Sequence, residues 1–259
     1  MSKLKVNLFQ MNTVWENPEL NLKEINRQIL INHGADLFIL PEMFNTGFTQ
    51  NVEQFAEDEN GNTLTAVKEM ARISETAICG SMLYKENDKY YNAFVFVKPD
   101  GQIIKYYKRH IFRIGMESEK ITPGKERVVI NYLGVRFLLQ ICYDLRFPVW
   151  NRNSEDYDAI INVANWPAVR RDTFDTLLKA RAIENLCYVF SVNRIGVDAN
   201  DVSYNGGTQV FDYKGELIAK VEDNVSDCIK VEIETKDIEE YKKVFPAHLD
   251  RDNFQLFAD

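Results

Sequence analysis

The 259-residue sequence predicts an α/β fold in which two β-sheets pack against each other and helices cover the outside. Apolar stretches of strand length far outnumber amphipathic helical stretches. Two or more strands also follow one another between helices, which a single doubly wound sheet accommodates poorly. No Ser/Gly-rich linker and no block of like charges divides the chain. We therefore expect one domain over residues 1–259.

The first half of the chain alternates predicted strands with predicted helices. A strand over residues 5–11 is followed by Asn17, which is suited to cap a helix with Pro18 at its first position. The next apolar stretch ends at Pro41, which cannot donate to a sheet ladder, so Glu42 is expected at the end of that strand. Further elements are a helix over 63–74, a strand over 77–84, and strands over 91–97 and 103–107 joined by a turn at 99–101.

In the second half, the most informative element is an apolar stretch over residues 135–141, which is typical of a buried strand and is followed by Cys142. A thiol at the carboxyl end of a buried strand is held in place, and it faces the edge where ligands bind in α/β sheets. The remaining predicted elements are a strand over 159–164, a helix over 173–185, a strand over 187–193 and a hairpin turn at 213–215.

Three predicted strand ends carry side chains that suit covalent catalysis. Glu42 offers a carboxylate, Lys108 an ammonium group and Cys142 a thiol. Each also has an ordinary interpretation, as a solvated turn residue, a surface lysine and a small core residue respectively. Sequence separation does not prevent the three from meeting, because strand ends converge in folded sheets.

The sequences around these residues resemble the motifs of the nitrilase superfamily of carbon-nitrogen hydrolases. The matching motifs are PEMF at 41–44, YYKRHIF at 106–112 and ICYDLRFP at 141–148, and the resemblance extends over essentially the whole chain. It implies a four-layer α-β-β-α sandwich in which Glu42, Lys108 and Cys142 form the catalytic triad. Superfamily members also carry a second Glu after the Lys, and this position falls on Glu117, with Glu119 as the alternative.

The resemblance also implies a reaction course. Cys142 attacks the amide carbon, and Lys108 stabilises the oxyanion together with the backbone N–H of Tyr143. Glu42 acts as general base and general acid while ammonia leaves. Water then hydrolyses the thioester.

Three longer stretches resemble the omega-amidase branch of the superfamily: CYDLRFPVW at 142–150, NVANWP at 162–167 and KARAIENLCYVFSVNRIG at 179–196. True nitrilases usually carry Trp-Glu after the nucleophile, where this chain has Tyr143-Asp144. This difference favours an amide over a nitrile. The resemblance therefore implies a short dicarboxylic acid monoamide as substrate, such as 2-oxoglutaramate.

Several residues are candidates for binding that substrate. Arg146 or the pair Arg170-Arg171 is suited to hold a carboxylate through paired hydrogen bonds, although each is equally suited to a surface ion pair. Trp166 either lines the pocket or packs in the interior. The residues do not decide between these roles.

Other functions remain open at this point. An amidase for aliphatic or N-carbamoyl amides fits the same superfamily. A Cys–His hydrolase would have to use His110, one of three histidines in the chain. A non-catalytic binding module is disfavoured because Glu42, Lys108 and Cys142 are all present.

The overall charge of the chain indicates which classes of binding partner to expect. A net charge of −8 and a pI near 5.1 disfavour nucleic acid, which needs a basic surface. No apolar stretch approaches the roughly 20 residues of a membrane-spanning helix, and the amino terminus lacks an apolar signal core. We expect a cytoplasmic protein.

The cysteines and the chain end complete the expectations. Cys79, Cys187 and Cys228 fall in apolar stretches without metal-ligand spacing, so we predict core positions for them and no metal or organic cofactor. A homodimer is expected from the resemblance and from apolar residues at 244–246 and 254–257.

Overall fold

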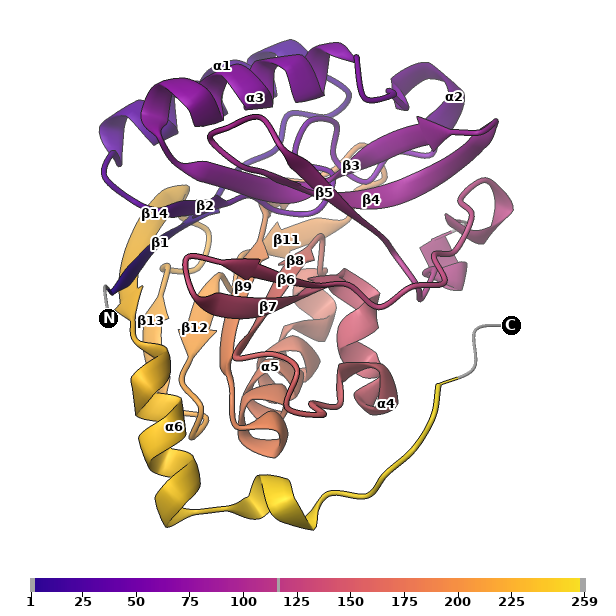
Figure 1. Cartoon of the computed structure of the whole chain (residues 1–259). Helices are drawn as coiled ribbons and strands as arrows, with labels where there is room; N and C mark the ends of the chain where they lie inside the picture. The colour runs from indigo at the N-terminus through magenta and orange to yellow at the C-terminus, as the bar shows by residue number, and fades with distance from the viewer. Residues whose placement is uncertain (1–2, 116, 257–259) are drawn as a thin grey trace.

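Two six-stranded sheets lie face to face in the computed structural model, which describes residues 3–115 and 117–256 (Figure 1). The strand order of the first sheet is β14 (Asp227–Ile233), β1 (Leu4–Gln10), β2 (Leu37–Ile39), β3 (Ala77–Glu86), β4 (Lys89–Val97) and β5 (Ile103–Tyr107). The order of the second is β13 (Leu217–Lys220), β12 (Gln209–Phe211), β9 (Tyr188–Asn193), β8 (Ala159–Ala164), β7 (Val135–Ile141) and β6 (Val129–Tyr132). A short hairpin of β10 (Ile195–Val197) and β11 (Ser203–Asn205) stands apart from both sheets.

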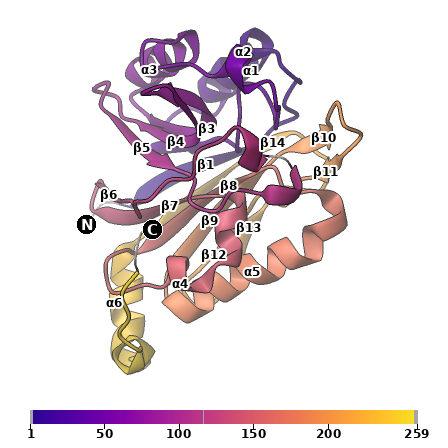
Figure 2. The ribbon, with the colours of Figure 1, turned by 90° about the vertical axis from the view of Figure 1, so that its right-hand side faces the viewer.

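Helices cover the outer faces of the sheets. Figure 2 shows α1 (Pro18–Ile31) and α3 (Asn62–Ser74) beyond the first sheet and α5 (Arg171–Asn185) beyond the second. The shorter helices are α2 (Val52–Phe55), α4 (Pro148–Asn151) and α6 (Thr235–Val244). Among the described residues, no helix combines the length and the apolar composition needed to cross a membrane.

Three apolar layers hold these elements together. The largest lies between the two sheets and includes Phe94, Phe137 and Phe190. A second packs α1 and α3 against the first sheet, and a third packs α5 against the second sheet through Phe174 and Leu178. The four-layer α-β-β-α sandwich that the resemblance implied is therefore confirmed.

Most predicted elements occur within a few residues of their expected bounds, and Asn17 caps α1 by accepting a hydrogen bond from the Leu20 N–H at 3.1 Å. The strand predicted to end at Pro41 is two residues shorter than expected, because β2 stops at Ile39. Leu40 and Pro41 still form backbone hydrogen bonds with the β3 segment, and the turn begins at Glu42. Several elements had no prediction: β6, β10, β11, β14, α2, α4 and α6. All but β14 and α6 have at most four residues, too few to show a clear period.

Strand direction brings the candidate residues to neighbouring sheet edges. In the first sheet β1, β2 and β3 are parallel, and β5 runs in the same direction because both β3 and β5 pair antiparallel with β4. In the second sheet β7, β8 and β9 are parallel. The carboxyl ends of β2 and β5 therefore share one edge, and those of β7 and β8 share another.

Candidate active site

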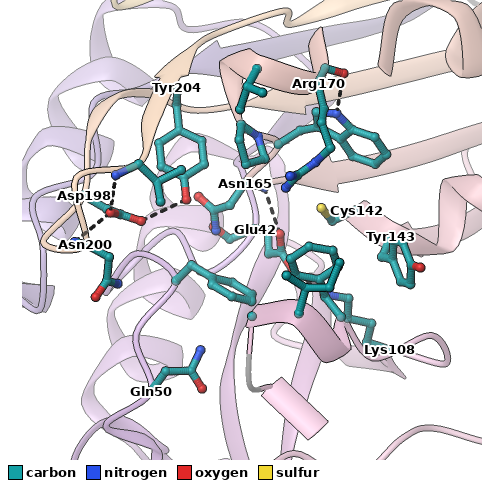
Figure 3. A pocket seen from close by; sticks show the side chains of 18 of the residues that line it. Glu42, Gln50, Lys108, Cys142, Tyr143, Asn165, Arg170, Asp198, Asn200 and Tyr204 are labelled. Carbon is teal, nitrogen blue, oxygen red and sulfur yellow. Dashed lines mark hydrogen bonds and ion pairs between the residues drawn. The ribbon is translucent and has the colours of Figure 1, made fainter. Parts of the chain in front are cut away.

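Glu42 follows β2 in a turn and is fully buried, with 0% exposure. Its Oε1 accepts hydrogen bonds from Lys108 Nζ and Asn92 Nδ2, both at 2.8 Å. Its Oε2 accepts from the Asn165 backbone N–H at 2.8 Å, a contact that crosses from the second sheet (Figure 3). Three donors from three different elements therefore fix the orientation of this carboxylate.

Lys108 follows β5 and is buried between two carboxylates. Its Nζ lies 2.8 Å from Glu42 Oε1 and 3.0 Å from Glu117 Oε2. Burial alone would lower the pKa of Lys108, but the charges of Glu117 and Glu42 outweigh burial and raise that pKa above its ordinary value. The ammonium group is therefore a permanent positive charge at the base of the site.

Of the two candidates for the second glutamate, the structure places Glu117, and not Glu119, beside Lys108. Glu117 is buried and also accepts hydrogen bonds from the Phe112 backbone N–H at 2.9 Å and from Asn92 Nδ2 at 3.0 Å. Glu119 is exposed on the surface. Burial raises the pKa of Glu117 above its ordinary value, and Lys108 offsets this effect only in part.

This raised pKa has a measurable consequence for stability. Because the folded protein binds the Glu117 proton more tightly than the unfolded chain does, this group's contribution to stability is lost as the pH rises above about 4.3 and through the raised folded value. The Glu117→Gln variant cannot ionise there, so its melting temperature relative to wild type should increase with pH over that range. Thermal unfolding of both proteins from about pH 4 to about pH 8 checks this expectation. Glu119→Gln, at an exposed position outside the site, is the control. A melting-temperature difference between Glu117→Gln and wild type that shrinks as the pH rises would contradict the assignment.

Cys142 is the first residue after β7 and begins the 3-10 helix Cys142–Arg146. Its backbone φ is +46°, a left-handed conformation that is uncommon for a non-glycine residue and costs free energy. Burial raises the pKa of the Cys142 thiol well above its ordinary value, and the Glu42 carboxylate raises it further, although Lys108 acts in the opposite direction. A nucleophilic role for this thiol would therefore require a base that removes its proton.

The turn that carries Cys142 is held from behind by two buried side chains. Arg181 of α5 donates to the Leu145 carbonyl through Nε at 3.0 Å and Nη2 at 2.7 Å. Asn151 Nδ2 donates to the carbonyls of Asp144 at 2.9 Å and Phe147 at 2.6 Å. These bonds stabilise a backbone that is intrinsically strained at Cys142.

A cavity of about 640 Å³ opens in front of these groups. Its lining includes Glu42, Lys108 and Cys142, together with apolar residues such as Phe48 and Phe112. Figure 3 shows Asp198, Asn200 and Tyr204 on the opposite side of the cavity from Cys142 and Tyr143. A cavity of this size and mostly apolar lining is typical of a small-molecule site.

The structure places three of the four candidate substrate-binding residues at the cavity and the fourth elsewhere. Arg146, Arg170 and Trp166 line the cavity. Trp166 does so while also packing, since it is 3% exposed and its ring stacks on Phe174 at 5.0 Å. Arg171 is not brought to the cavity, which corrects the prediction of an Arg170-Arg171 pair: its guanidinium contacts Asp175 at 2.7 Å and Asp223 at 3.2 Å.

His110, which a Cys–His hydrolase would require, is not among the residues lining the cavity. Its Nδ1 lies 2.8 Å from Asp144 Oδ1, and its ring stacks on Phe147 at 3.7 Å. The imidazole is thus engaged away from the thiol, and the geometry gives the Cys–His alternative no support.

Asn92 and Asn165 are site residues to which no sequence pattern assigned a role. Asn92 Nδ2 bridges Glu42 and Glu117, and Asn165 holds Glu42 through its backbone N–H and through Nδ2, which donates to the Glu42 carbonyl at 2.8 Å. A weak signal existed for both. Asn92 is a polar residue inside an apolar strand, and Asn165 directly follows one.

The family-model match and the fold together define the class of the protein: this α-β-β-α sandwich, with a buried glutamate, a buried lysine and a strand-end cysteine at one pocket, is a member of the nitrilase superfamily. The chain belongs to the carbon-nitrogen hydrolase family, whose model matches residues 5–243. It is an enzyme that hydrolyses the carbon-nitrogen bond of amides.

Named relatives agree with this family. The omega-amidase YafV of Yersinia enterocolitica is 40% identical over 256 residues, covering 99% of this chain and 100% of that protein. The 2-oxoglutaramate amidase of Bacillus subtilis is 30% identical and covers 82% of this chain and 83% of its own length. A crystal structure of a CN-hydrolase superfamily protein from Xanthomonas campestris, with an arsenic adduct in its active site, superposes with a TM-score of 0.96 at 37% identity and covers 99% of this chain and 100% of its own.

Proposed function

We propose that this enzyme is an omega-amidase that hydrolyses the terminal amide of a short dicarboxylic acid monoamide, with 2-oxoglutaramate as the leading substrate. The observation that carries the proposal is the buried Glu42–Lys108 pair, 2.8 Å apart, at the same cavity as the Cys142 thiol. Similarity to proteins named omega-amidase and 2-oxoglutaramate amidase supports the substrate class.

In the proposed reaction Cys142 attacks the amide carbon while Glu42 takes the thiol proton. The negative charge that develops on the carbonyl oxygen is stabilised by the Lys108 ammonium and the backbone N–H of Tyr143. Glu42 returns the proton to the amide nitrogen, the carbon-nitrogen bond breaks and ammonia leaves a thioester on Cys142. Water, deprotonated by Glu42, then attacks the thioester and releases the dicarboxylic acid and the thiol.

Glu117 has a supporting part in this scheme. It does not line the cavity, but it holds Lys108 and Asn92, and both of these contact Glu42. Its carboxyl group therefore fixes the lysine and the base relative to each other.

The carboxylate of the substrate requires a cationic partner, and we assign it to Arg146 and Arg170. Each guanidinium lies over an aromatic ring of the cavity lining: Arg146 over Trp166 at 5.5 Å and Arg170 over Phe112 at 5.4 Å. Among the residues that the structure describes, neither arginine forms an ion pair with an acidic side chain. Both are therefore available to bind a carboxylate.

Removing either guanidinium should weaken recognition of the free acid. A hydrogen bond to a charged group contributes about 1.5–3 kcal/mol, so Arg170→Gln or Arg146→Gln should reduce kcat/KM for 2-oxoglutaramate by about one to two powers of ten, mainly through KM. The measurement compares 2-oxoglutaramate with an ester-capped, uncharged analogue for each variant. Arg171→Gln is the matched control, because Arg171 is the chain neighbour of Arg170 but lies outside the cavity lining. If the wild-type enzyme has the same kcat/KM for both substrates, it does not recognise the carboxylate. The enzyme would then be a general aliphatic amidase.

The expectations about cofactors, oligomeric state and cellular setting are part of the same proposal. Glu42, Lys108 and Cys142 supply base, charge and nucleophile, so the reaction requires no metal or organic cofactor. A homodimer would cover the exposed apolar residues at the end of α6, where Val244 is 84% and Phe245 52% exposed. Phe257, part of the apolar tail that motivated this expectation, lies outside the described residues. A cytoplasmic setting remains the expectation from the sequence.

A further inference from the structure

We propose that Asp144 is a positioning residue that fixes the position of the Cys142 nucleophile relative to Lys108. This inference rests on the proposed roles of those two residues. Asp144 lies two positions after Cys142, has 0% exposure and is not part of the cavity lining. Its carboxylate accepts four hydrogen bonds from two separate segments of the chain.

One of these bonds closes the turn around the nucleophile. Asp144 Oδ2 accepts from the Ile141 backbone N–H at 3.0 Å, so residues on either side of Cys142 are joined directly. The enclosed Cys142 has the left-handed φ of +46°. Such a conformation persists only where the surroundings hold it, and this bond is the most local of the restraints.

The other three bonds come from the segment that carries Lys108. Tyr106 Oη donates to Asp144 Oδ2 at 2.7 Å. The His110 backbone N–H donates to Oδ1 at 3.0 Å, and His110 Nδ1 lies 2.8 Å from the same oxygen. Asp144 is therefore hydrogen-bonded to the chain two residues before and two residues after Lys108.

The same carboxylate thus connects the end of β5 in the first sheet with the end of β7 in the second. Arg109, between these hydrogen-bonded residues, donates its backbone N–H to Tyr106 Oη at 3.1 Å, which tightens the β5 side further. In the reaction, Lys108 must reach an oxygen whose position is set by the bond to Cys142. An error of about 1 Å in such an arrangement can cost about 100-fold in rate, so a fixed connection between the two segments has a catalytic effect.

A carboxylate suits this position because every group that faces it is a donor. An asparagine would present an NH₂ group toward a backbone N–H or the Tyr106 hydroxyl, and it would lose the charge that strengthens the bonds. Asp144→Asn therefore keeps the size of the side chain and weakens the connection, because one acceptor oxygen remains in place of two. Asp144→Glu keeps the carboxylate and serves as the conservative replacement.

The experiment compares these variants with wild type at a temperature well below their melting temperatures. We expect Asp144→Asn to lower kcat by about 10- to 100-fold with a smaller change in KM, and Asp144→Glu to recover part of the loss. Tyr106→Phe removes a single donor and should change kcat in the same direction by a smaller factor, which keeps the test available if Asp144→Asn does not fold. The matched control is Asp212→Asn, because Asp212 is a buried carboxylate that accepts the backbone N–H groups of Lys214 and Glu216, both at 2.9 Å, in the β12–β13 turn and does not line the cavity.

A second measurement separates positioning from general destabilisation. Lys108 lowers the pKa of the Cys142 thiol, so displacing it should move the pH profile of Cys142 alkylation by iodoacetamide to higher pH in Asp144→Asn but not in Asp212→Asn. A variant that melts earlier yet keeps the wild-type kcat and alkylation profile would overturn the proposal. Wild-type protein that hydrolyses no amide would instead refute the proposed function, and the alkylation profile would still test the role of Asp144.

Discussion

Replacing Cys142 with alanine is expected to reduce kcat/KM for the amide substrate by at least about 10⁴-fold. No other described thiol can take its place, since Cys79 and Cys187 are buried in the core and the partly buried Cys228 lies on β14, away from the cavity lining. The fold should be retained, because Cys142 is a small side chain at the edge of a cavity. Burial of Cys79 and Cys187 agrees with the prediction for these two residues, whereas Cys228 is buried only in part.

Mass spectrometry makes this test specific. Wild-type enzyme that is quenched during turnover should carry an acyl group on the peptide containing Cys142, and Cys142→Ala should carry none. Cys228→Ala is the control and should keep both the adduct and the activity. An adduct on another cysteine, or wild-type activity in Cys142→Ala, would refute the nucleophile assignment.

Replacing Lys108 with methionine is expected to affect both activity and stability. The change leaves Glu42 and Glu117, which are at most 1% exposed, without the charge that compensates them. Breaking a buried ion pair in this way typically costs about 3–5 kcal/mol in the free energy of unfolding. Loss of the oxyanion charge should also lower kcat by about 100- to 1,000-fold in the protein that remains folded.

Urea unfolding at neutral pH measures the stability part of this prediction. Lys105→Met is the matched control three residues earlier, on β5, because the Lys105 ion pair with Glu86 is partly exposed and should contribute at most about 1 kcal/mol. Adding Glu117→Gln to Lys108→Met should restore part of the lost stability by removing one of the two uncompensated carboxylates. If Lys108→Met unfolds at the same urea concentration as Lys105→Met, the buried cluster is not the source of stability that we infer.

Much of the α-β-β-α sandwich could be predicted from the sequence, and so could the three catalytic candidates. The end of a strand is a local feature, so an apolar stretch followed by Lys108 or Cys142 already indicates where these side chains emerge. The relation between the three catalytic candidates came from matching motifs. The pattern of apolar residues does not indicate that β2 and β7 belong to different sheets whose ends face each other.

The parts that sequence could not provide depend on long-range contacts. Asn92 has its partners 25 and 50 residues away, and all partners of Asp144 except Ile141 lie 34 to 38 residues away. Nothing in the residues next to Asn92 and Asp144 indicates those distant partners. Arg170 and Arg171 are adjacent in the chain, yet one reaches the cavity and the other binds Asp175 and Asp223. Only the path of the chain into α5 separates them.

The placement of the site between the two sheets also has a consequence for how the chain folds. Glu42 and Lys108 extend from the first sheet, whereas Cys142 and Asn165 extend from the second. A folding intermediate in which only one sheet has formed holds either the base and the cation or the nucleophile, but never the complete set. Amide hydrolysis therefore requires that both sheets have formed and have packed against each other.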